Sequence, residues 1–362
     1  MKVLHVEAGM HLYGGALQVC FLMRGLRAQG VANVLACPQG SAIAQEAAPL
    51  ARVVTLPMSG DLDAGVLGRL RRLIRQERPD VVHLHSRRGI DVWGALAARR
   101  EGVPVVLSRR VDNPESRLWV ALKYRLYDHV VAISDGIRQV LLQEGLPAAK
   151  LSCVPSAVDV QRYHPTREHL PWFRQTFGVA TDELAVGMIA QFIERKGHDV
   201  LLSALPAVLD AHPRTKVLLF GQGPRQEDIR QRVQSSPVLA ANVLLPGFRS
   251  DLDRILPCLD VVAHPAFMEG LGVSLLQAAA CGVPLVGTRA GGIPEIVQSG
   301  LNGELVDPGD ATALAVALQR LLGDAALRER QGRAAREWVV ERFSVDAMVA
   351  GNLAVYRRLL HA

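Results

Sequence analysis

The sequence has no long apolar run, few cysteines and few aromatic residues, and each shortage argues against a class of protein. Its longest apolar stretches, such as residues 130–133 and 283–286, have the length of a strand and are far too short to span a membrane. The five cysteines are scattered without a CxxC pair, which argues against a disulfide framework or a zinc site, and no metal is expected. Aromatic residues make up 5% of the chain, too few for the basic, aromatic-rich stripe of a nucleic-acid-binding protein, so no nucleic-acid partner is expected.

Two motifs are also missing near the N-terminus. The apolar segment 3–6 is interrupted by His5 and followed by Glu7, so it predicts a strand rather than a signal peptide, and we expect a cytoplasmic protein. After this segment comes Gly14-Gly15 instead of GxGxxG, which argues against an NAD-dependent oxidoreductase.

The pattern that is present is an alternation of apolar, strand-like runs with amphipathic helical segments, which is typical of an α/β fold with parallel sheets. It occurs in two successive series, and 362 residues are enough for two cores. The predicted strands are 3–6, 34–36, 53–56, 81–84, 105–107 and 130–133, and then 185–189, 216–220, 243–245, 261–263 and 284–287. We therefore expect two Rossmann-like domains.

The regular pattern is interrupted between residues 155 and 176, where the boundary between the domains is expected. We predict an N-terminal domain at 1–165 and a C-terminal domain at 166–342, with a final helix at 343–360 that packs back on the first domain. Ligands of open α/β sheets bind outside the carboxyl ends of the strands, so the expected site is a cleft between the domains.

The net charge of +6 comes from the N-terminal part of the chain. Residues 1–170 hold 22 Lys and Arg against 15 Asp and Glu, and the remainder holds 19 against 20. A basic half can attract an anionic membrane or an anionic saccharide, and ordinary surface charge that keeps the protein in solution is an equal alternative.

Three motifs of the first domain are candidates for a site. Gly14-Gly15 before a helical pattern would let backbone amides approach a phosphate, although a structural turn is about as good an explanation. His85 ends a buried strand, where site residues belong, and a hydrogen-bonded core histidine is the alternative. His83 lies on the same face as His85, but no acidic or thiol partner supports a metal site. Two basic pairs are candidates for an anionic acceptor, or for a solvated rim: Arg87, Arg88, Arg109 and Arg110.

Two motifs of the second domain stand out. Arg195 and Lys196 precede Gly197 and a helix, a suitable arrangement for a diphosphate clamp. Glu269 precedes a glycine-rich helix start and lies eight residues before Gln277, so both could reach one extended ligand if the helix begins early. A capped helix between two strands is the alternative.

Taken together, these residues resemble glycosyltransferase family 4, a retaining family of GT-B architecture in which two Rossmann-like domains face each other across a deep cleft. The resemblance extends over essentially the whole chain. The segments that carry it are Gly14-Gly15, the strand ending in His85, Ser134-Asp135, Lys196-Gly197, Gly247-Phe248, the Glu269 segment, 291–297 and Phe343-Ser344.

The resemblance implies roles for particular residues. His85 and Glu269, the first carboxylate of the family's E-x7-E motif, would be the catalytic pair, and Gly15, Arg195 and Lys196 would bind the donor diphosphate. Donor sugar and nucleotide would contact Gln191, Phe248, Arg249, Gly270, Leu271, Gly272 and Gln277. Three positions depart from the family pattern: Gln277 replaces the second carboxylate, Gln191 stands where many members have arginine, and Ser156-Ala157 replaces Asn-Gly.

The expected function is therefore transfer of a sugar, with net retention, from a nucleotide diphosphate sugar to a glycan or glycolipid in lipopolysaccharide or surface polysaccharide biosynthesis. A nucleotide-sugar epimerase of the same architecture is the alternative. The resemblance implies no cofactor beyond the donor, for which a UDP-sugar is expected. The basic N-terminal half predicts peripheral contact with the inner face of the membrane.

Overall fold

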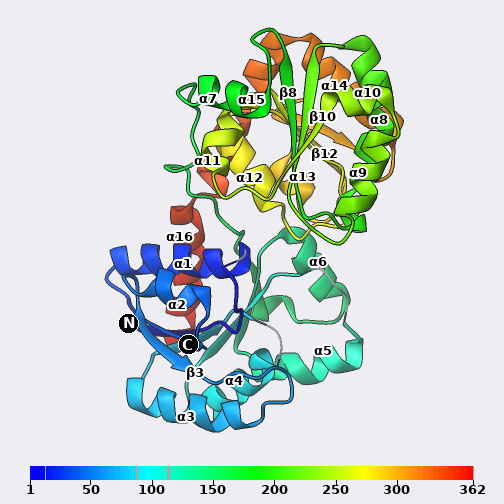
Figure 1. Cartoon of the computed structure of the whole chain (residues 1–362). Coiled ribbons are helices and arrows are strands. Elements are labelled where there is room, and N and C mark those ends of the chain that lie inside the picture. Colours follow the sequence, from blue (N-terminus) through cyan, green and yellow to red (C-terminus); the bar gives the residue numbers. More distant parts are fainter. Residues whose placement is uncertain (13, 87–88, 112–114, 362) are drawn as a thin grey trace. The chain divides into compact units, whose positions relative to one another are not determined.

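The structure, a computed structural model, describes residues 1–12, 14–86, 89–111 and 115–361. It divides into two compact units (Figure 1). Unit 1 comprises Met1–Ala157 together with the segment that begins at Val345, and unit 2 comprises Val158–Ser344. The boundary therefore follows Ala157, eight residues before the predicted position after residue 165, because Val158 and Tyr163, which precede helix α7 (Leu170–Phe177), already belong to the core of unit 2.

Unit 1 is built on a seven-stranded parallel sheet in the order β3-β2-β1-β4-β5-β6-β7. Its strands are β1 (Lys2–Val6), β2 (Ala32–Pro38), β3 (Arg52–Leu56), β4 (Val81–Leu84), β5 (Val105–Arg109), β6 (His129–Ala132) and β7 (Leu151–Cys153). The apolar runs predict six of them. The seventh, β7, contains only three residues and carries no recognisable period of its own.

Helices cover both faces of this sheet. They are α1 (Gly14–Ala28), α2 (Ala42–Ala47), α3 (Gly65–Glu77), α4 (Ile90–Arg100), α5 (Arg117–Lys123), α6 (Asp135–Gln143) and α16 (Val345–Leu360). The C-terminal helix α16 lies beside α1 (Figure 1), and Met348, Leu353 and Tyr356 share a core cluster with Phe21 and Leu26 of α1. The last helix of the chain thus completes the core of the first unit.

Unit 2 contains a six-stranded parallel sheet in the order β10-β9-β8-β11-β12-β13. The strands are β8 (Leu184–Ile189), β9 (Thr215–Phe220), β10 (Val243–Gly247), β11 (Val261–His264), β12 (Leu285–Thr288) and β13 (Gly303–Val306). Besides α7, the helices are α8 (His198–Ala211), α9 (Gln226–Gln234), α10 (Pro237–Asn242), α11 (Leu252–Ile255), α12 (Val273–Ala280), α13 (Ile293–Ile296), α14 (Ala311–Gly323) and α15 (Ala325–Arg342).

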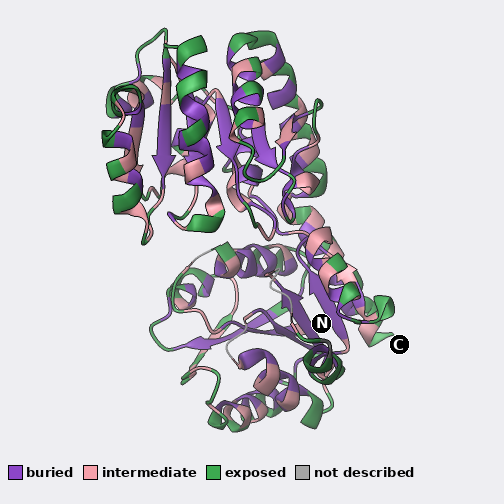
Figure 2. Ribbon diagram, turned by 90° about the vertical axis from the view of Figure 1, so that its right-hand side faces the viewer, coloured by how far each residue is buried: buried purple, intermediate pink, exposed green. Residues whose placement is uncertain are grey.

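The inner strands of both units are buried, the edge strands β3 and β10 are mostly half-buried or exposed, and the helices expose their outer faces (Figure 2). This explains why the strands read as continuous apolar runs, since a parallel sheet is covered on both faces. Within the part of the chain that the structure describes, no helix is long and apolar enough to cross a bilayer.

Candidate active site

In each sheet the strand order reverses once, and two of the predicted site residues in each unit follow the strands that flank the reversal. In unit 1 the reversal lies between β1, which leads to Gly15, and β4, which leads to His85. In unit 2 it lies between β8, which leads to Lys196, and β11, which leads to Glu269. Ligands of open α/β sheets bind at this topological switch point, outside the carboxyl ends of the strands.

The switch point of unit 2 holds a compact cluster of charged groups around Glu269. Lys196 Nζ lies 2.5 Å from Glu269 Oε2, and His264 Nε2 lies 2.8 Å from the same oxygen. Lys196 ends the short 3-10 turn η3 (Glu194–Lys196), and His264 is the last residue of β11. Both partners of the Glu269 carboxylate thus lie at or just beyond the carboxyl ends of central strands.

The environment of Glu269 keeps its carboxylate ionised. Burial by itself would raise its pKa, but the hydrogen bond and charge of His264, together with the charge of Lys196, outweigh burial and lower the pKa to about 2. A charged carboxylate next to a lysine can bind sugar hydroxyls while the lysine neutralises an anionic neighbour.

Two glycines allow the cluster to form. Gly197 has φ of +75°, and a Cβ at this position would lie 1.9 Å from the carbonyl oxygen of Pro265. Gly291 has φ of +52°, and a Cβ there would lie 1.8 Å from the carbonyl oxygen of Glu269. Only glycine fits such approaches, so these residues let the turn that carries Lys196 and the Gly291-Gly292 turn pack against the loop that carries Glu269.

The early helix start that would align Glu269 with Gln277 is absent. Helix α12 begins at Val273, and its N-cap Gly272 has φ of +102°, so Glu269 lies in the loop before the helix. Gln277 Nε2 donates a hydrogen bond to the hydroxyl of Tyr163, 3.0 Å away. The side chain of Leu271 is buried in the core of unit 2, so only its backbone can contact a ligand.

The other predicted donor residues are spread over neighbouring loops of unit 2. Gln191 follows β8 and is exposed, as is Arg195, which borders a hollow together with Phe267. Phe248 follows β10 and is 64% exposed. The guanidinium of Arg249 binds the carboxylate of Asp251 through two hydrogen bonds, 2.8 and 2.5 Å long. Gly270 lies between Glu269 and Leu271 in the loop.

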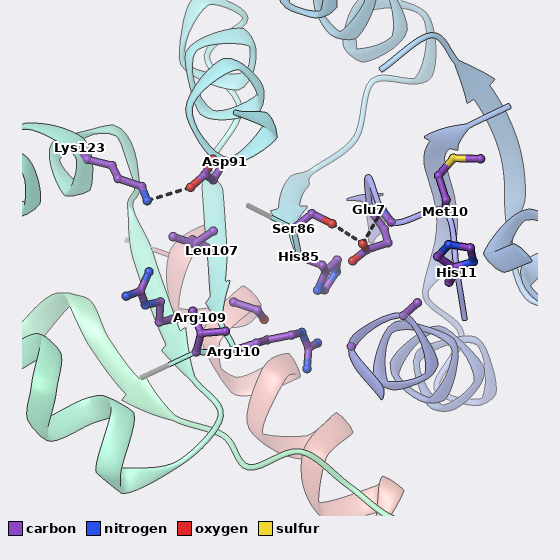
Figure 3. Close-up of a pocket in the computed structure, with 15 residues that line it drawn as sticks. Glu7, Met10, His11, His85, Ser86, Asp91, Leu107, Arg109, Arg110 and Lys123 are labelled. Carbon is purple, nitrogen blue, oxygen red and sulfur yellow. Dashed lines mark hydrogen bonds and ion pairs between the residues drawn. The ribbon is translucent and has the colours of Figure 1, made fainter. Parts of the chain in front are cut away.

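The switch point of unit 1 opens into a cavity of about 430 Å³ (Figure 3). Gly15, at the start of α1, and His85 both line it. Next to His85, the carboxylate of Glu7 accepts hydrogen bonds from the hydroxyl of Ser86 and from the backbone amide of Gly9 (Figure 3). The cavity therefore presents both an imidazole and a carboxylate to a ligand.

The basic residues of the cavity have different environments. Arg109 is buried and forms an ion pair with Glu115, which also binds Lys123, and Lys123 binds Asp91. The charge of Arg109 is therefore already balanced, which argues against its predicted place in a basic cluster for an anionic acceptor. Arg110 lines the cavity beside Gly15, and burial lowers its pKa to about 10, although Glu7 and Tyr356 oppose this effect. Arg87 and Arg88 lie outside the described residues.

Three buried histidines, His5, His83 and His85, bring ring nitrogens within 4.8 Å of one another in unit 1. Such a group could hold a metal, but five of its six ring nitrogens already have polar partners. His5 bonds Asn33 and His85, and His83 bonds Tyr356 and Ser108. The donor set is thus committed to hydrogen bonds and does not fit a metal site.

Comparison with known proteins identifies the family. The model of glycosyltransferase family 4 matches residues 13–162, and the model of glycosyl transferases group 1 matches residues 172–338, so the two together cover most of the chain. The chain belongs to glycosyltransferase family 4. The protein is thus a glycosyltransferase of GT-B architecture, as the resemblance implies.

One relative by sequence and two solved structures of the same fold are similar to this glycosyltransferase. The GDP-mannose-dependent alpha-(1-6)-phosphatidylinositol monomannoside mannosyltransferase of Mycolicibacterium smegmatis is 29% identical over 76% of each chain. A glycosyltransferase structure from Rickettsia africae superposes with a TM-score of 0.89 at 20% identity, covering 99% of this chain and 98% of the other. Anabaena HepE in complex with UDP and glucose superposes with a TM-score of 0.83 at 21% identity, covering 98% and 99%.

The sequence assigns no individual contact to several residues of these two switch points. His264 is the clearest: the segment 264–277 is expected to hold the donor, but the bond of His264 to Glu269 is not predicted, although its place at the carboxyl end of a strand was a usable signal. His5 meets His85, and Glu7 meets Ser86, only because β1 and β4 are neighbours in the sheet. No local pattern marks that pairing.

Proposed function

We propose that this family 4 enzyme transfers a sugar from a nucleotide diphosphate sugar, preferably a UDP-sugar, to a glycan or glycolipid acceptor. The anomeric configuration is retained, and the product belongs to a bacterial lipopolysaccharide or surface polysaccharide. The observation that carries the proposal is the Lys196, Glu269 and His264 cluster at the switch point of unit 2. The mannosyltransferase relative is named for a phosphatidylinositol mannoside, which supports a glycolipid acceptor. The HepE structure is a complex with UDP and glucose, which supports a UDP-sugar donor.

In the proposed reaction the bond between the anomeric carbon and the diphosphate oxygen breaks, and the acceptor hydroxyl oxygen attacks the same face of that carbon. The acceptor proton passes to the departing phosphate, and the nucleoside diphosphate leaves. Lys196 balances the negative charge that develops on the diphosphate, and the N-terminus of α12 favours the same charge. Glu269 positions the sugar by accepting hydrogen bonds from its hydroxyls.

The cavity of unit 1, which Gly15 and His85 line, would bind the acceptor. Glu7 and Asp91 are carboxylates that can accept hydrogen bonds from acceptor hydroxyls, and Arg110 offers a cation to an anionic group of the acceptor. This division of labour assigns the transferred sugar and its nucleotide to unit 2 and the acceptor to unit 1.

An exposed apolar face on unit 1 supports contact with an anionic membrane. On α5, Leu118 and Leu122 are 83% and 61% exposed, and Trp119 is exposed beside them. Arg125 follows α5, and exposed Arg99 donates a hydrogen bond to its carbonyl group, so cations lie next to the apolar face. Apolar side chains beside cations are the composition of an interfacial membrane contact.

Sedimentation with liposomes tests this contact. We expect anionic vesicles to bind the enzyme more strongly at low salt than at high salt, and replacement of Leu118 and Leu122 by serine to weaken binding. The control is Leu301→Ser, which removes an exposed leucine of unit 2. Equal failure to bind anionic and neutral vesicles would count against membrane contact.

Activity assays test the proposed transfer. Lys196→Ala and Glu269→Ala should each lower turnover by at least about 100-fold while the fold is retained, because each removes a charge that the transition state needs. The control is Arg214→Ala, which breaks an exposed ion pair of the same 2.5 Å length with Asp182. Near-normal turnover in either site variant would remove its assigned role.

Two further measurements define the substrates. Product analysis without an acceptor separates transfer from epimerisation, since an epimerase would convert the donor alone. A thermal-shift screen with UDP, GDP, ADP and CDP identifies the nucleotide, because a ligand that binds only the folded state at 100 times its Kd stabilises it by about 2.7 kcal/mol. We expect UDP to give the largest shift.

A further inference from the structure

A row of buried polar side chains lies on the face of the unit 1 sheet that α1 and α16 cover. His5 of β1 is in register with His83 of β4, and His85 follows two residues later. Asn33 of β2 is in register with Val3, on the same side as His5. Buried polar groups need hydrogen-bond partners, so the order of donors and acceptors along this row is constrained.

The amide of Asn33 sets the direction of the chain of hydrogen bonds. Its Nδ2 donates to the carbonyl oxygens of Met23, at 2.9 Å, and Leu50, at 3.4 Å. Both amide hydrogens are therefore committed, and Oδ1 can only accept. His5 Nε2 lies 3.2 Å from this oxygen, so Nε2 of His5 carries a hydrogen and donates it to Asn33.

The same reasoning applies to the next hydrogen bond, between His5 and His85. Burial lowers the pKa of His5 to about 4, in spite of its hydrogen bond to Asn33, so the ring is neutral and its Nδ1 carries a lone pair. His85 Nε2 lies 3.0 Å from this nitrogen and must donate to it. Burial also lowers the pKa of His85 well below its ordinary value. Nδ1 of His85 is therefore unprotonated.

Nδ1 of His85 is the one end of the chain that is left open. Among the described residues it has no hydrogen-bond partner, although the side chain is only 4% exposed, and His85 lines the cavity of unit 1. A bare ring nitrogen accepts a hydrogen bond from a hydroxyl and repels the oxygens of a phosphate. His85 is thus suited to a hydroxyl, whereas Arg110, which lines the same cavity, is suited to an anionic group.

We infer that Asn33 and His5 are positioning residues that hold His85 in the tautomer with a bare Nδ1, which gives the cavity a fixed acceptor for a substrate hydroxyl. The inference rests on the proposed glycosyl transfer for the identity of that hydroxyl. In a catalytic triad a carboxylate stabilises the protonated imidazole, whereas the hydrogen bonds from His85 through His5 end at the neutral amide of Asn33. His85 therefore acts as a neutral hydrogen-bond acceptor and does not carry a proton during the reaction.

Nitrogen-15 NMR of the full chain with labelled histidine tests the tautomer without any need for turnover, and His85→Ala assigns the signals. We expect a protonated Nε2 and an unprotonated Nδ1 for His85, a mixture of tautomers in His5→Leu, and the original tautomer in His5→Asn, which keeps an oxygen acceptor near the position of Nδ1. The control is His129→Leu, which removes a buried imidazole of β6 that bonds Ser152 and Arg358. A proton on Nδ1 of wild-type His85 would overturn the inference.

A double-mutant cycle tests whether His5 acts through His85. His5→Leu should lower kcat/KM roughly tenfold, the value of about one neutral hydrogen bond, and should cause no further loss when His85 is already alanine. His5→Asn should recover most of the activity. Equal losses in both backgrounds would show a purely structural role for His5 and refute the inference. If the wild type transfers no sugar at all, the proposed function fails, while the NMR result still decides the tautomer.

Discussion

The strongest quantitative prediction concerns Glu269→Gln, which removes the charge of the carboxylate and keeps its size. A pKa lowered from the ordinary 4.5 to about 2 stabilises the folded state at neutral pH by about 3 kcal/mol, since each pKa unit corresponds to about 1.4 kcal/mol. The side chain of Glu269 is 15% exposed and that of Lys196 is 11% exposed, so solvent screening is limited. We expect Glu269→Gln to destabilise unit 2 by an amount of this order at pH 7.

The stability difference between wild type and Glu269→Gln should depend on pH, in a direction set by the lowered pKa of Glu269. A carboxyl group whose pKa is lowered by folding contributes its full stabilisation above the pKa of the unfolded chain, and the contribution is lost as the pH falls through the folded value. The difference between wild type and Glu269→Gln should therefore be constant from pH 7 to about pH 5, fall to roughly half near pH 3, and vanish below about pH 2.

Hydrogen exchange of unit 2 peptides in increasing urea measures this difference for one unit at a time, which matters because the two units need not unfold together. The matched control is Asp182→Asn, which breaks the exposed ion pair with Arg214 at the same 2.5 Å distance. We expect at most about 1 kcal/mol for this pair. A Glu269→Gln protein as stable as wild type at pH 7, or a difference independent of pH down to 3, would refute the electrostatic account.

Two further predictions concern packing. Gly197→Ala should lower both the thermal stability of unit 2 and transfer, because the new Cβ would lie 1.9 Å from the carbonyl oxygen of Pro265, whereas Gly178→Ala, at φ of +64° with open space around it, should cost only about 1 kcal/mol. Equal effects of the two substitutions would contradict this packing argument. Gln18→Leu should destabilise unit 1 by about 1 to 3 kcal/mol, because Gln18 makes two hydrogen bonds of 2.7 Å with the backbone of Ala157, and urea unfolding of unit 1 within error of wild type would show that they contribute nothing.

The sequence predicts the architecture well because the signals for it are local. Continuous apolar runs mark strands that are buried on both faces, and eleven of the thirteen strands carry such a run. The two strands that the sequence does not predict are β7 and β13, which are three and four residues long. The two central positions of β13 are only half-buried. Strands this short depend on pairing with a neighbour rather than on their own composition.

The candidate site could be predicted only in part. His85, Lys196 and Glu269 were found because each follows a predicted strand, and Gln277 was aligned with them by spacing. Its bond to Tyr163 shows the limit of spacing, since the partner lies 114 positions away in sequence. The sequence does predict a helix from Val273 to Cys281, and α12 (Val273–Ala280) confirms it, with Gly272 turning the chain at a left-handed φ just before it.

By itself, the sequence determined the order of strands and helices and offered candidate residues for glycosyl transfer, among them His85, Lys196 and Glu269, each of which follows a strand. Only the tertiary structure decided how they combine. The strand order places β1 beside β4 and β8 beside β11, and this adjacency creates both switch points and joins Lys196 to Glu269 and His5 to His85. The physical reason is that hydrogen bonds between parallel strands join segments far apart along the chain, so the partners of a buried polar group are set by the sheet and not by local sequence.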